Sequence, residues 1–305
     1  ALDPKIHSID FVEKLQNICI KNQSQTYLFK SNPVDQIWNV EFCDSAIARP
    51  KNPAIEIVDH PIRYAGKNKQ EKIAELLKLY QEDAILISES ESICWLMNIR
   101  CHGAVQYTPI MPCYAILYRD GECDFFADYD GSEKLLSFFE VENVVNSTNG
   151  VNFKTEITKK FNSIAIDPKQ SNYAIYKALK DAGKEVVYKK NKIIEQKCIK
   201  NQVEIDNFID AHEVDGLALT KFLCWLDKSV EQGLELDELS VEKKLFEFRS
   251  ENESFIYDSF RSISGYGSNG AIIHYHASEK SNKQFKKGSL YLIDSVVNIK
   301  RVQLT

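Results

Sequence analysis

Helical and strand patterns alternate along residues 68–196, and this alternation restricts the possible folds of the chain more than any other feature. Near its start, Ile73, Leu76 and Leu77 recur at helical spacing, with Lys, Glu and Gln on the other side. The apolar run 84–88 then predicts a buried strand. Further helices are predicted near 132–140, 152–161 and 171–183, and strands near 143–146, 163–167 and 185–189. This order is typical of an α/β layer domain.

The region 197–305 has a different pattern, with helices first and strands after them. Residues 202–231 predict one long amphipathic helix, and 240–251 predict a second. The apolar side of the long helix is formed by Ile205, Phe208, Ile209, Leu217, Leu219, Phe222, Leu223 and Leu226. Strands are predicted at 255–264, 270–275 and 289–293. These elements predict an unfinished α+β domain, whose exposed strand edges favour association with another chain.

Residues 1–67 show little periodicity. Pro50, Pro53 and Pro61 interrupt short apolar pieces between 45 and 66, so this stretch is predicted to be an extended linker. The first residues, Ala-Leu-Asp-Pro-Lys, contain neither a basic nor an apolar stretch, and no signal peptide is expected from them.

Composition and charge exclude several classes of protein. Hydrophobic residues make up 44% and charged residues 27% of the 305 residues, which excludes a disordered chain and supports full-sized cores. The net charge of −6 disfavours a general nucleic-acid surface. No apolar run approaches the roughly 18 residues that a membrane helix needs. We therefore expect neither nucleic acid nor a membrane among the partners.

Eight cysteines are scattered along the chain without a CxxC pair. Several lie in apolar settings, such as Cys224 between Leu223 and Trp225. This pattern indicates buried, reduced thiols in a cytoplasmic protein, with a zinc site or a disulfide framework as the alternatives.

The segment 264–275 combines Gly, Ser and Asn with an apolar run that ends at His274 and Tyr275. The glycines allow tight turns and the close approach of a ligand, but a phosphate cradle would lead into a helix and not into a strand. On a strand, His274 and His276 would point to the same face and could bind zinc or copper. A single histidine is more often a core or surface residue, so the residues alone leave the role of His274 open.

Asp294 and His212 are also ambiguous when each is taken alone. Asp294 ends the apolar run 290–293, where a carboxylate is costly unless it is hydrogen-bonded or bound to metal. It is therefore either a capping or turn residue or a functional one. His212 does not belong to an HExxH zinc motif, because Gly216 occupies the place of the second histidine. A packed or surface role is expected for His212.

Taken together, these segments resemble Xaa-Pro aminopeptidase (aminopeptidase P). The segment Asn-Gly-Ala-Ile-Ile-His-Tyr at 269–275, followed by Tyr-Leu-Ile-Asp-Ser at 291–295, carries the resemblance. Segments 32–38, 93–100 and 200–226 are also similar to parts of that enzyme, so the resemblance covers nearly the whole chain. Its family is that of the pita-bread metallopeptidases, together with prolidase, methionine aminopeptidase and creatinase.

The resemblance implies three parts. Residues 1–67 correspond to a remnant of the family's first domain and a linker. Residues 68–196 correspond to the creatinase-N-like middle α/β domain, which is a mixed sheet with flanking helices. Residues 197–305 correspond to the N-terminal part of a pita-bread α+β catalytic domain, which is incomplete here.

The resemblance also implies a reaction. In that family, two divalent metal ions, usually manganese, lie between two Asp, one His and two Glu and hold a water or hydroxide that attacks the bond before proline. Asp294 matches the first Asp ligand. His274 matches the active-site histidine, which contacts the substrate or shuttles protons without binding metal, and His276 has no counterpart. The implied substrates are Xaa-Pro peptides.

The chain departs from the family after Asp294. The family pattern continues with Ser-Gly-Gly-Gln-Tyr and ends in Gly-Thr-Thr-Asp. Here Val296 and Val297 follow Ser295, and Thr305 stands where the second Asp ligand is expected. Deleting one nucleotide from a plausible coding sequence for the family pattern reproduces residues 295–305, so we interpret this tail as the product of a frameshift.

On this comparison, four of the five metal ligands are absent from the chain. We therefore expect a truncated, inactive form that binds no manganese, because one carboxylate cannot clamp two cations. Two alternatives remain. The chain is either a non-catalytic binding or dimerising module, which forms a homodimer, or the N-terminal half of a split aminopeptidase that a separate C-terminal fragment completes.

Overall fold

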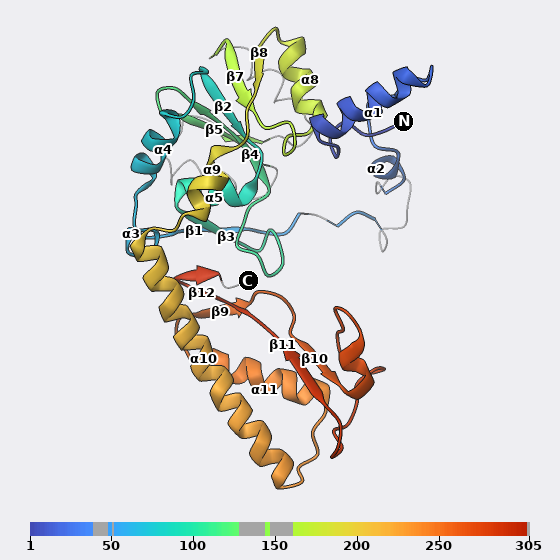
Figure 1. Cartoon of the computed structure of the whole chain (residues 1–305), viewed down its shortest axis with the longest axis vertical. Coiled ribbons are helices and arrows are strands. Elements are labelled where there is room, and N and C mark those ends of the chain that lie inside the picture. Colours follow the sequence, from blue (N-terminus) through green and yellow to red (C-terminus); the bar gives the residue numbers. More distant parts are fainter. Residues whose placement is uncertain (39–47, 51, 128–143, 147–160, 304–305) are drawn as a thin grey trace. The chain divides into compact units, whose positions relative to one another are not determined.

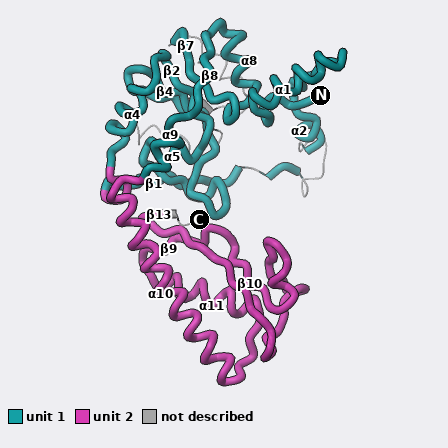
Figure 2. Tube along the Cα trace, viewed as in Figure 1, with its two compact units in different colours: residues 1–62, 67–199 teal, residues 63–66, 200–305 magenta. Residues whose placement is uncertain are grey.

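The computed structural model describes residues 1–38, 48–50, 52–127, 144–146 and 161–303. The chain forms two compact units (Figure 2). Unit 1 comprises residues 1–62 and 67–199, and unit 2 comprises 63–66 and 200–305. The chain passes from unit 1 to unit 2 after Ile199, and residues 1–62 group with unit 1.

A six-stranded mixed sheet forms the centre of unit 1 (Figure 1). Its strand order is β6-β5-β4-β2-β7-β8, with the bounds β2 (Ala84–Ile87), β4 (Cys113–Tyr118), β5 (Cys123–Ala127), β6 (Val144–Asn146), β7 (Ser163–Ile166) and β8 (Glu185–Tyr188). Strands β2, β7 and β8 run parallel, and β4 is antiparallel to both of its neighbours. The predicted α/β class is confirmed, and the strands expected near 143–146, 163–167 and 185–189 are β6, β7 and β8.

Helices cover both faces of this sheet, because successive strand residues point to opposite sides. On one face, residues such as Ile85, Ile87 and Phe125 pack with Leu76 of α4 (Lys69–Leu77), Ile93 of α5 (Ser90–Met97) and Ile193 of α9 (Lys192–Cys198). On the other face, residues such as Leu86, Ile116 and Ile164 pack with Ile9 of α1 (Ile9–Lys21) and Leu179 of α8 (Tyr173–Asp181). Each fully buried aliphatic side chain contributes about 1.5–3 kcal/mol, so two separate apolar layers stabilise unit 1.

A small two-stranded sheet includes part of the predicted linker. β1 (Glu56–Asp59) pairs antiparallel with β3 (Ile99–His102), and α3 (Ile62–Ala65) follows β1. The prediction of an extended linker over 45–66 is therefore wrong for these residues, because Ile55 and Ile57 are buried in the core of unit 1. A short helix, α2 (Pro33–Ile37), precedes this region. The helices expected near 132–140 and 152–161 lie outside the described residues, apart from Phe161.

A buried ammonium group links α4 to the end of α5. Lys72 is 2% exposed, and its Nζ donates to the carbonyl oxygen of Trp95 at 2.9 Å and to Oδ1 of Asn98 at 2.7 Å. The same Nζ lies 4.0 Å from the centroid of the Trp95 ring. The N–H of His60 donates to the carbonyl oxygen of Asn98 at 2.7 Å. Burial, followed by the charges of Arg100 and Lys72, lowers the pKa of His60 from 6.5 to about 3.

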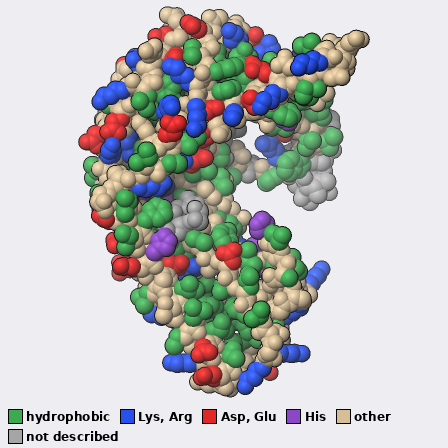
Figure 3. Space-filling view, viewed as in Figure 1, with side chains coloured by type: hydrophobic (Ala, Val, Ile, Leu, Met, Phe, Trp, Pro, Cys, Tyr) green, Lys and Arg blue, Asp and Glu red, His purple; other side chains and the backbone are tan. Residues whose placement is uncertain are grey.

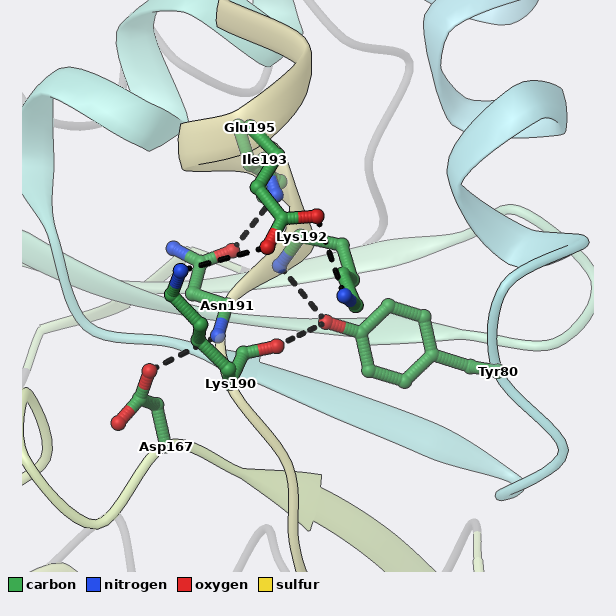
Figure 4. Close-up of polar contacts among 7 residues, drawn as sticks. All are labelled: Tyr80, Asp167, Lys190, Asn191, Lys192, Ile193 and Glu195. Atoms are coloured by element: carbon green, nitrogen blue, oxygen red, sulfur yellow. Dashed lines mark hydrogen bonds and ion pairs between the residues drawn. The ribbon is translucent and has the colours of Figure 1, made fainter. Parts of the chain in front are cut away.

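Helix α9 begins at a hydrogen-bonded turn that ties it to the sheet (Figure 4). Asn191 caps the helix by accepting from the N–H of Ile193 at 2.9 Å, and its own N–H donates to Oδ2 of Asp167 at 2.8 Å. The N–H of Lys192 donates to Oη of Tyr80 at 3.1 Å. Burial raises the pKa of Tyr80, so the phenol keeps its proton. These bonds fix the last helix of unit 1 against β7 and the chain that precedes β2.

Two helices and two small sheets build unit 2. Helix α10 (Gln202–Glu231) begins at a capping box, in which the side chains of Asn201 and Glu204 each accept the other residue's N–H. Helix α11 (Glu238–Ser250) packs against α10 around a core that includes Phe222, Val241 and Leu245. β10 (Ile263–Tyr266) pairs with β11 (Tyr291–Asp294), and β9 (Phe255–Asp258), β12 (Val297–Ile299) and β13 (Val302–Gln303) form a three-stranded antiparallel sheet. Both predicted helices are confirmed, whereas the strand predicted over 255–264 is divided into β9 and β10.

Part of the apolar stripe predicted on α10 faces outward. Phe222 is fully buried, but Ile209, Leu217 and Leu223 are 50–59% exposed. Cys224 is exposed as well, so its predicted burial is wrong. The core of unit 2 uses one stripe of the helix, and the remaining apolar residues lie at its surface.

The buried cysteines belong to unit 1. They are Cys94, Cys101, Cys113 and Cys123. Burial raises the thiol pKa of all of them, to about 12 for Cys101. Within the described residues every cysteine is a free thiol, and Cys43 lies outside them. The buried thiols are protonated at neutral pH and are therefore weak nucleophiles.

The surface carries mixed charges. On the face shown in Figure 3, Lys and Arg side chains alternate with Asp and Glu over unit 1, and hydrophobic side chains gather over unit 2. Of the helices that the structure describes, none is both long enough and apolar enough to cross a lipid bilayer.

Candidate functional site

The antiparallel pair of β10 and β11 is the framework that carries Asp294. Its register places Asp294 opposite Ile263 and Tyr291 opposite Tyr266. Aromatic contacts hold the pair from one side, since the ring centroids of Tyr266 and Phe285 are 4.7 Å apart and those of Phe285 and Tyr291 are 4.9 Å apart. Asp294 is the last residue of β11, and its side chain is exposed.

Two glycines let the chain fold back against β10 after the strand ends. A Cβ on Gly265 would lie 2.8 Å from Cα of Gly270, and a Cβ on Gly270 would lie 3.2 Å from the carbonyl oxygen of Gly265. No side chain fits between these two backbones. The glycines of this motif therefore serve a close backbone contact, after which the 3₁₀ helix η1 (Gly267–Ala271) replaces a continued strand.

The strand predicted over 270–275 is wrong. The chain leaves η1 in a turn, and His274 has a φ of 54°, in the left-handed region. His274 and His276 are both exposed. The described residues 272–276 do not form a strand, so the alternation that would place both imidazoles on one face for zinc or copper is absent there. Asn269 accounts for the difference, because its buried amide donates to the carboxylate of Glu238 and so draws the segment into the turn.

The two residues assigned by resemblance lie on neighbouring segments of unit 2. His274 follows η1, which begins where β10 ends, whereas Asp294 pairs with Ile263 at the start of β10. Within the described residues, no hydrogen bond or ion pair joins the two side chains. Both are exposed, and exposed apolar residues adjoin them along the chain, namely Ile272, Ile273, Leu290 and Leu292.

A buried arginine holds the turn that follows Asp294. Arg249 is 3% exposed, and its guanidinium donates to Oδ1 of Asp215 at 2.9 Å, to Oδ1 of Asp258 at 3.0 Å and to Oγ of Ser295 at 3.1 Å. Burial raises the pKa of Asp258, and the charge of Arg249 offsets only part of this shift. The sequence did not reveal this cluster, because its members come from α10, α11, β9 and the end of β11.

The tail after Ser295 forms a hairpin. β12 pairs with β9 with an irregular register at Asn298, and Val297 and Ile299 are buried beneath α10 with Ala211. Val297 thus begins a strand, in keeping with the β-propensity of valine, whereas Val296 precedes β12. The strand is short, however, and the chain reverses after it into β13.

His212 lies in an open apolar groove along α10. The groove has a volume of about 680 Å³ and is lined by Lys200, Ile205, Phe208, Ile209, His212 and Glu213. Nδ1 of His212 lies 2.8 Å from the carbonyl oxygen of Phe208, and the two rings stack with centroids 6.3 Å apart. His212 therefore has a surface packing role, as expected.

Among the described ranges, no three His, Cys, Asp or Glu side chains lie close enough together to hold a metal ion. Asp294 offers a single carboxylate, whereas the resemblance implies that two Asp, one His and two Glu together hold the two metal ions. Thr305, at the place of the second Asp, lies outside the described residues.

Two family models match the chain. The Creatinase/Prolidase N-terminal domain matches residues 48–204, and Metallopeptidase family M24 matches residues 206–303. The chain belongs to the creatinase/prolidase family of M24 metallopeptidases. The resemblance inferred from the motifs at 269–275 and 291–295 is thereby confirmed.

Several curated relatives are Xaa-Pro aminopeptidases. Aminopeptidase P2 of Arabidopsis thaliana is 30% identical over 335 residues, which cover 97% of this chain and 45% of the relative. Xaa-Pro aminopeptidase ApepP of Drosophila melanogaster is 28% identical over 307 residues, which cover 97% of this chain and 48% of the relative. The chain thus spans about half the length of the curated relatives that it matches.

Solved structures share the fold. X-prolyl aminopeptidase from Caenorhabditis elegans, described as a cytosolic enzyme with a di-nuclear active site, matches with a TM-score of 0.83 and 23% identity, over 98% of this chain and 49% of that chain. A recombinant prolidase from Thermococcus sibiricus matches with a TM-score of 0.55 and 20% identity, over 80% of this chain and 63% of that chain. These matches confirm the expected fold, a creatinase-type N-terminal domain followed by pita-bread elements.

Proposed function

We propose that this chain forms the part of a two-metal Xaa-Pro aminopeptidase that bears His274 and Asp294. The observation that carries the proposal is the way in which the two motif segments pack. A Cβ on Gly270 would lie 3.5 Å from Cβ of Leu292, so the segment that leads to His274 lies against the strand that ends at Asp294. The names of the relatives from Arabidopsis thaliana and Drosophila melanogaster support the same reaction class.

In this proposal the two residues have separate roles. Asp294 is a metal ligand, and Arg249 keeps its backbone in place through Ser295. His274 contacts the Xaa-Pro peptide or carries a proton at its imidazole, without binding metal. The metal ions are divalent, with manganese preferred. We propose none of the described residues for the other four metal-ligand positions.

We further propose that the 305 residues alone do not hydrolyse Xaa-Pro bonds. A single carboxylate cannot coordinate and neutralise two divalent cations. The tail supports this view, because Val297 and Ile299 are buried in β12 where the family pattern has Gly and Tyr. We also propose that residues 295–305 are the product of a frameshift.

Association with another polypeptide is the second candidate function. Ile273 is 86% exposed and Leu290 is 88% exposed, and exposed apolar side chains next to an open strand edge favour a protein contact. The partner is either a C-terminal fragment that completes a split enzyme or a second copy in a homodimer. Light scattering separates these cases, because only a homodimer doubles the mass of the purified chain.

The proposed location of the protein is the cytoplasm. Reduced thiols in a buried setting, together with the cytosolic description of the Caenorhabditis elegans enzyme, support a cytoplasmic protein.

We propose that residues 1–67, 68–196 and 197–305 correspond to the remnant first domain, the middle domain and the beginning of the catalytic domain. Limited proteolysis tests these limits, since cleavage within 68–127 before cleavage near 197–202 would contradict them.

Manganese titration of the purified chain tests the proposed inactivity. We expect no binding of micromolar affinity or tighter by calorimetry, and no cleavage of an Xaa-Pro peptide. The matched variant is Asp294→Ala, with Asp227→Ala on α10 as the control. Micromolar manganese binding that Asp294→Ala abolishes and Asp227→Ala leaves intact would overturn the claim that this carboxylate lacks its partners.

A further inference from the structure

We propose that Glu238 is the positioning residue for His274. Its buried carboxylate holds the loop 267–283 in the conformation that presents the imidazole at the surface of unit 2. The role of His274 in catalysis rests on the proposed function, but the positioning itself is a property of this chain. Glu238 lies 36 residues before His274, on a different element.

Glu238 accepts hydrogen bonds from both ends of this loop. It is the first residue of α11 and is fully buried. Its Oε1 accepts from the N–H of Tyr266 at 2.6 Å and from Nδ2 of Asn269 at 3.0 Å. Its Oε2 accepts from Oη of Tyr275 at 2.8 Å and from the N–H of Lys283 at 3.1 Å. One carboxylate thus connects the end of β10, η1, the turn and the end of the loop.

These contacts require a carboxylate. An ionised Glu offers only acceptors, and its four partners here are all donors. A buried carboxylate without such bonds would be strongly destabilising. The N-terminus of α11, a helix of 13 residues, adds a favourable dipole at the same place. The loop conformation and the buried charge therefore depend on each other.

The bonded residues bracket His274. Asn269 precedes it by five positions, and Tyr275 follows it directly. Oη of Tyr275 also lies 3.1 Å from Oγ of Ser281, which ties the turn to the later part of the loop. His274 itself has a left-handed backbone, which a residue with a Cβ adopts when its surroundings impose it. The bonds of Glu238 to its neighbours supply that constraint.

A merely stabilising role and a positioning role make different predictions. If Glu238 only stabilised unit 2, its loss would loosen α10, α11 and the loop to the same extent. If it positions His274, the change is confined to the loop and reaches the imidazole. Hydrogen–deuterium exchange of the full chain, together with NMR of the histidine rings, measures both.

The main variant is Glu238→Gln, which places an amide NH₂ against hydrogen-bond donors. The control is Glu247→Gln on the same helix, because Glu247 pairs with Lys244 at the surface. We expect amide exchange in 267–283 to rise by about tenfold or more in Glu238→Gln, as the loss of a buried hydrogen bond implies. The ring signals of His274 should move while those of His212 stay, and Glu247→Gln should change neither.

A second variant, Tyr275→Phe, removes one hydroxyl, which donates to Glu238 and accepts from Nδ2 of Asn269. It leaves the carboxylate in place, so it serves if Glu238→Gln does not fold. We expect a smaller rise in exchange in the same loop and a shift of the His274 signals in the same direction. The proposal is overturned if either folded variant leaves the loop and His274 unchanged, or if exchange rises equally in α10 and α11. These measurements use neither metal nor peptide. A negative result would therefore leave the proposed hydrolytic function intact. Likewise, failure of the hydrolytic proposal would leave the positioning of His274 by Glu238 intact.

Discussion

Nη2 of Arg249 donates a 3.1 Å hydrogen bond to Oγ of Ser295, the residue that directly follows Asp294. The same guanidinium is bonded to Asp215 of α10 and Asp258 of β9. One buried cation therefore connects a helix, a strand and the end of β11. The position of Asp294 at the end of its strand depends on this cluster as well as on the β10–β11 ladder.

Replacing this cation should strongly destabilise unit 2. In Arg249→Met, the partly buried carboxylates of Asp215 and Asp258 lose their counter-charge, and we expect a loss of about 3–5 kcal/mol in the free energy of unfolding. Urea denaturation measures it. The control is Lys221→Met, which removes the exposed pair of Lys221 with Glu251 and should cost less than about 1 kcal/mol. Equal effects of the two variants would contradict the role given to Arg249.

The buried His60 should make the stability of unit 1 depend on pH. Its pKa is about 3 in the folded chain and 6.5 when unfolded, so the unfolded state binds the proton first. Stability is therefore complete above pH 6.5 and is lost as the pH falls from 6.5 toward 3. The loss attributable to His60 between pH 7.5 and pH 5 should be roughly 2 kcal/mol.

Urea unfolding at these two pH values, in the wild-type chain and in His60→Gln, checks this expectation. The variant should lose less stability on acidification. Some dependence should remain, because burial also lowers the pKa of His102. If His60→Gln and the wild type respond identically to pH, His60 is not held neutral in the folded chain.

The close contact of Gly265 with Gly270 gives a third prediction. Gly265→Ala would place a Cβ 2.8 Å from the Cα of Gly270, so the backbone must shift, and we expect a loss of about 1–3 kcal/mol. Gly216→Ala is the control, because at this position in the middle of α10 no atom beyond the neighbouring helix backbone lies within 4 Å of the added Cβ. That substitution should stabilise the chain by up to about 1 kcal/mol. Thermal denaturation measures the stability of both variants. If Gly265→Ala is as stable as the wild type, the tight packing of Gly265 against Gly270 is contradicted.

The sequence predicted those elements whose signals are local. The alternation of patterns predicted the layered α/β unit. The predicted helix over 202–231 coincides with α10. Only part of its apolar stripe is buried, because periodicity identifies a face and does not show how much of that face another element covers.

The surroundings of the candidate site could not be predicted in the same way. Tyr275 and Glu238 are 37 residues apart, and Arg249 and Ser295 are 46 residues apart, so no local pattern connects them. The apolar run before His274 favoured a strand by propensity, yet the buried hydrogen bonds of Asn269 outweigh that preference. Tertiary contacts decided the turn, whereas the resemblance to the family identified His274 and Asp294 as residues of interest.

The central claim is that Asp294 and His274 belong to a two-metal site that this chain does not complete. The most direct test is to mix the 305-residue chain with a separately produced catalytic half of a similar Xaa-Pro aminopeptidase, and to measure manganese-dependent release of the residue before proline. We predict no release by the chain alone, release by the mixture, and a return to background for Asp294→Asn but not for Asp227→Asn. Release by the chain alone, or by the mixture with Asp294→Asn at the wild-type rate, would contradict the account.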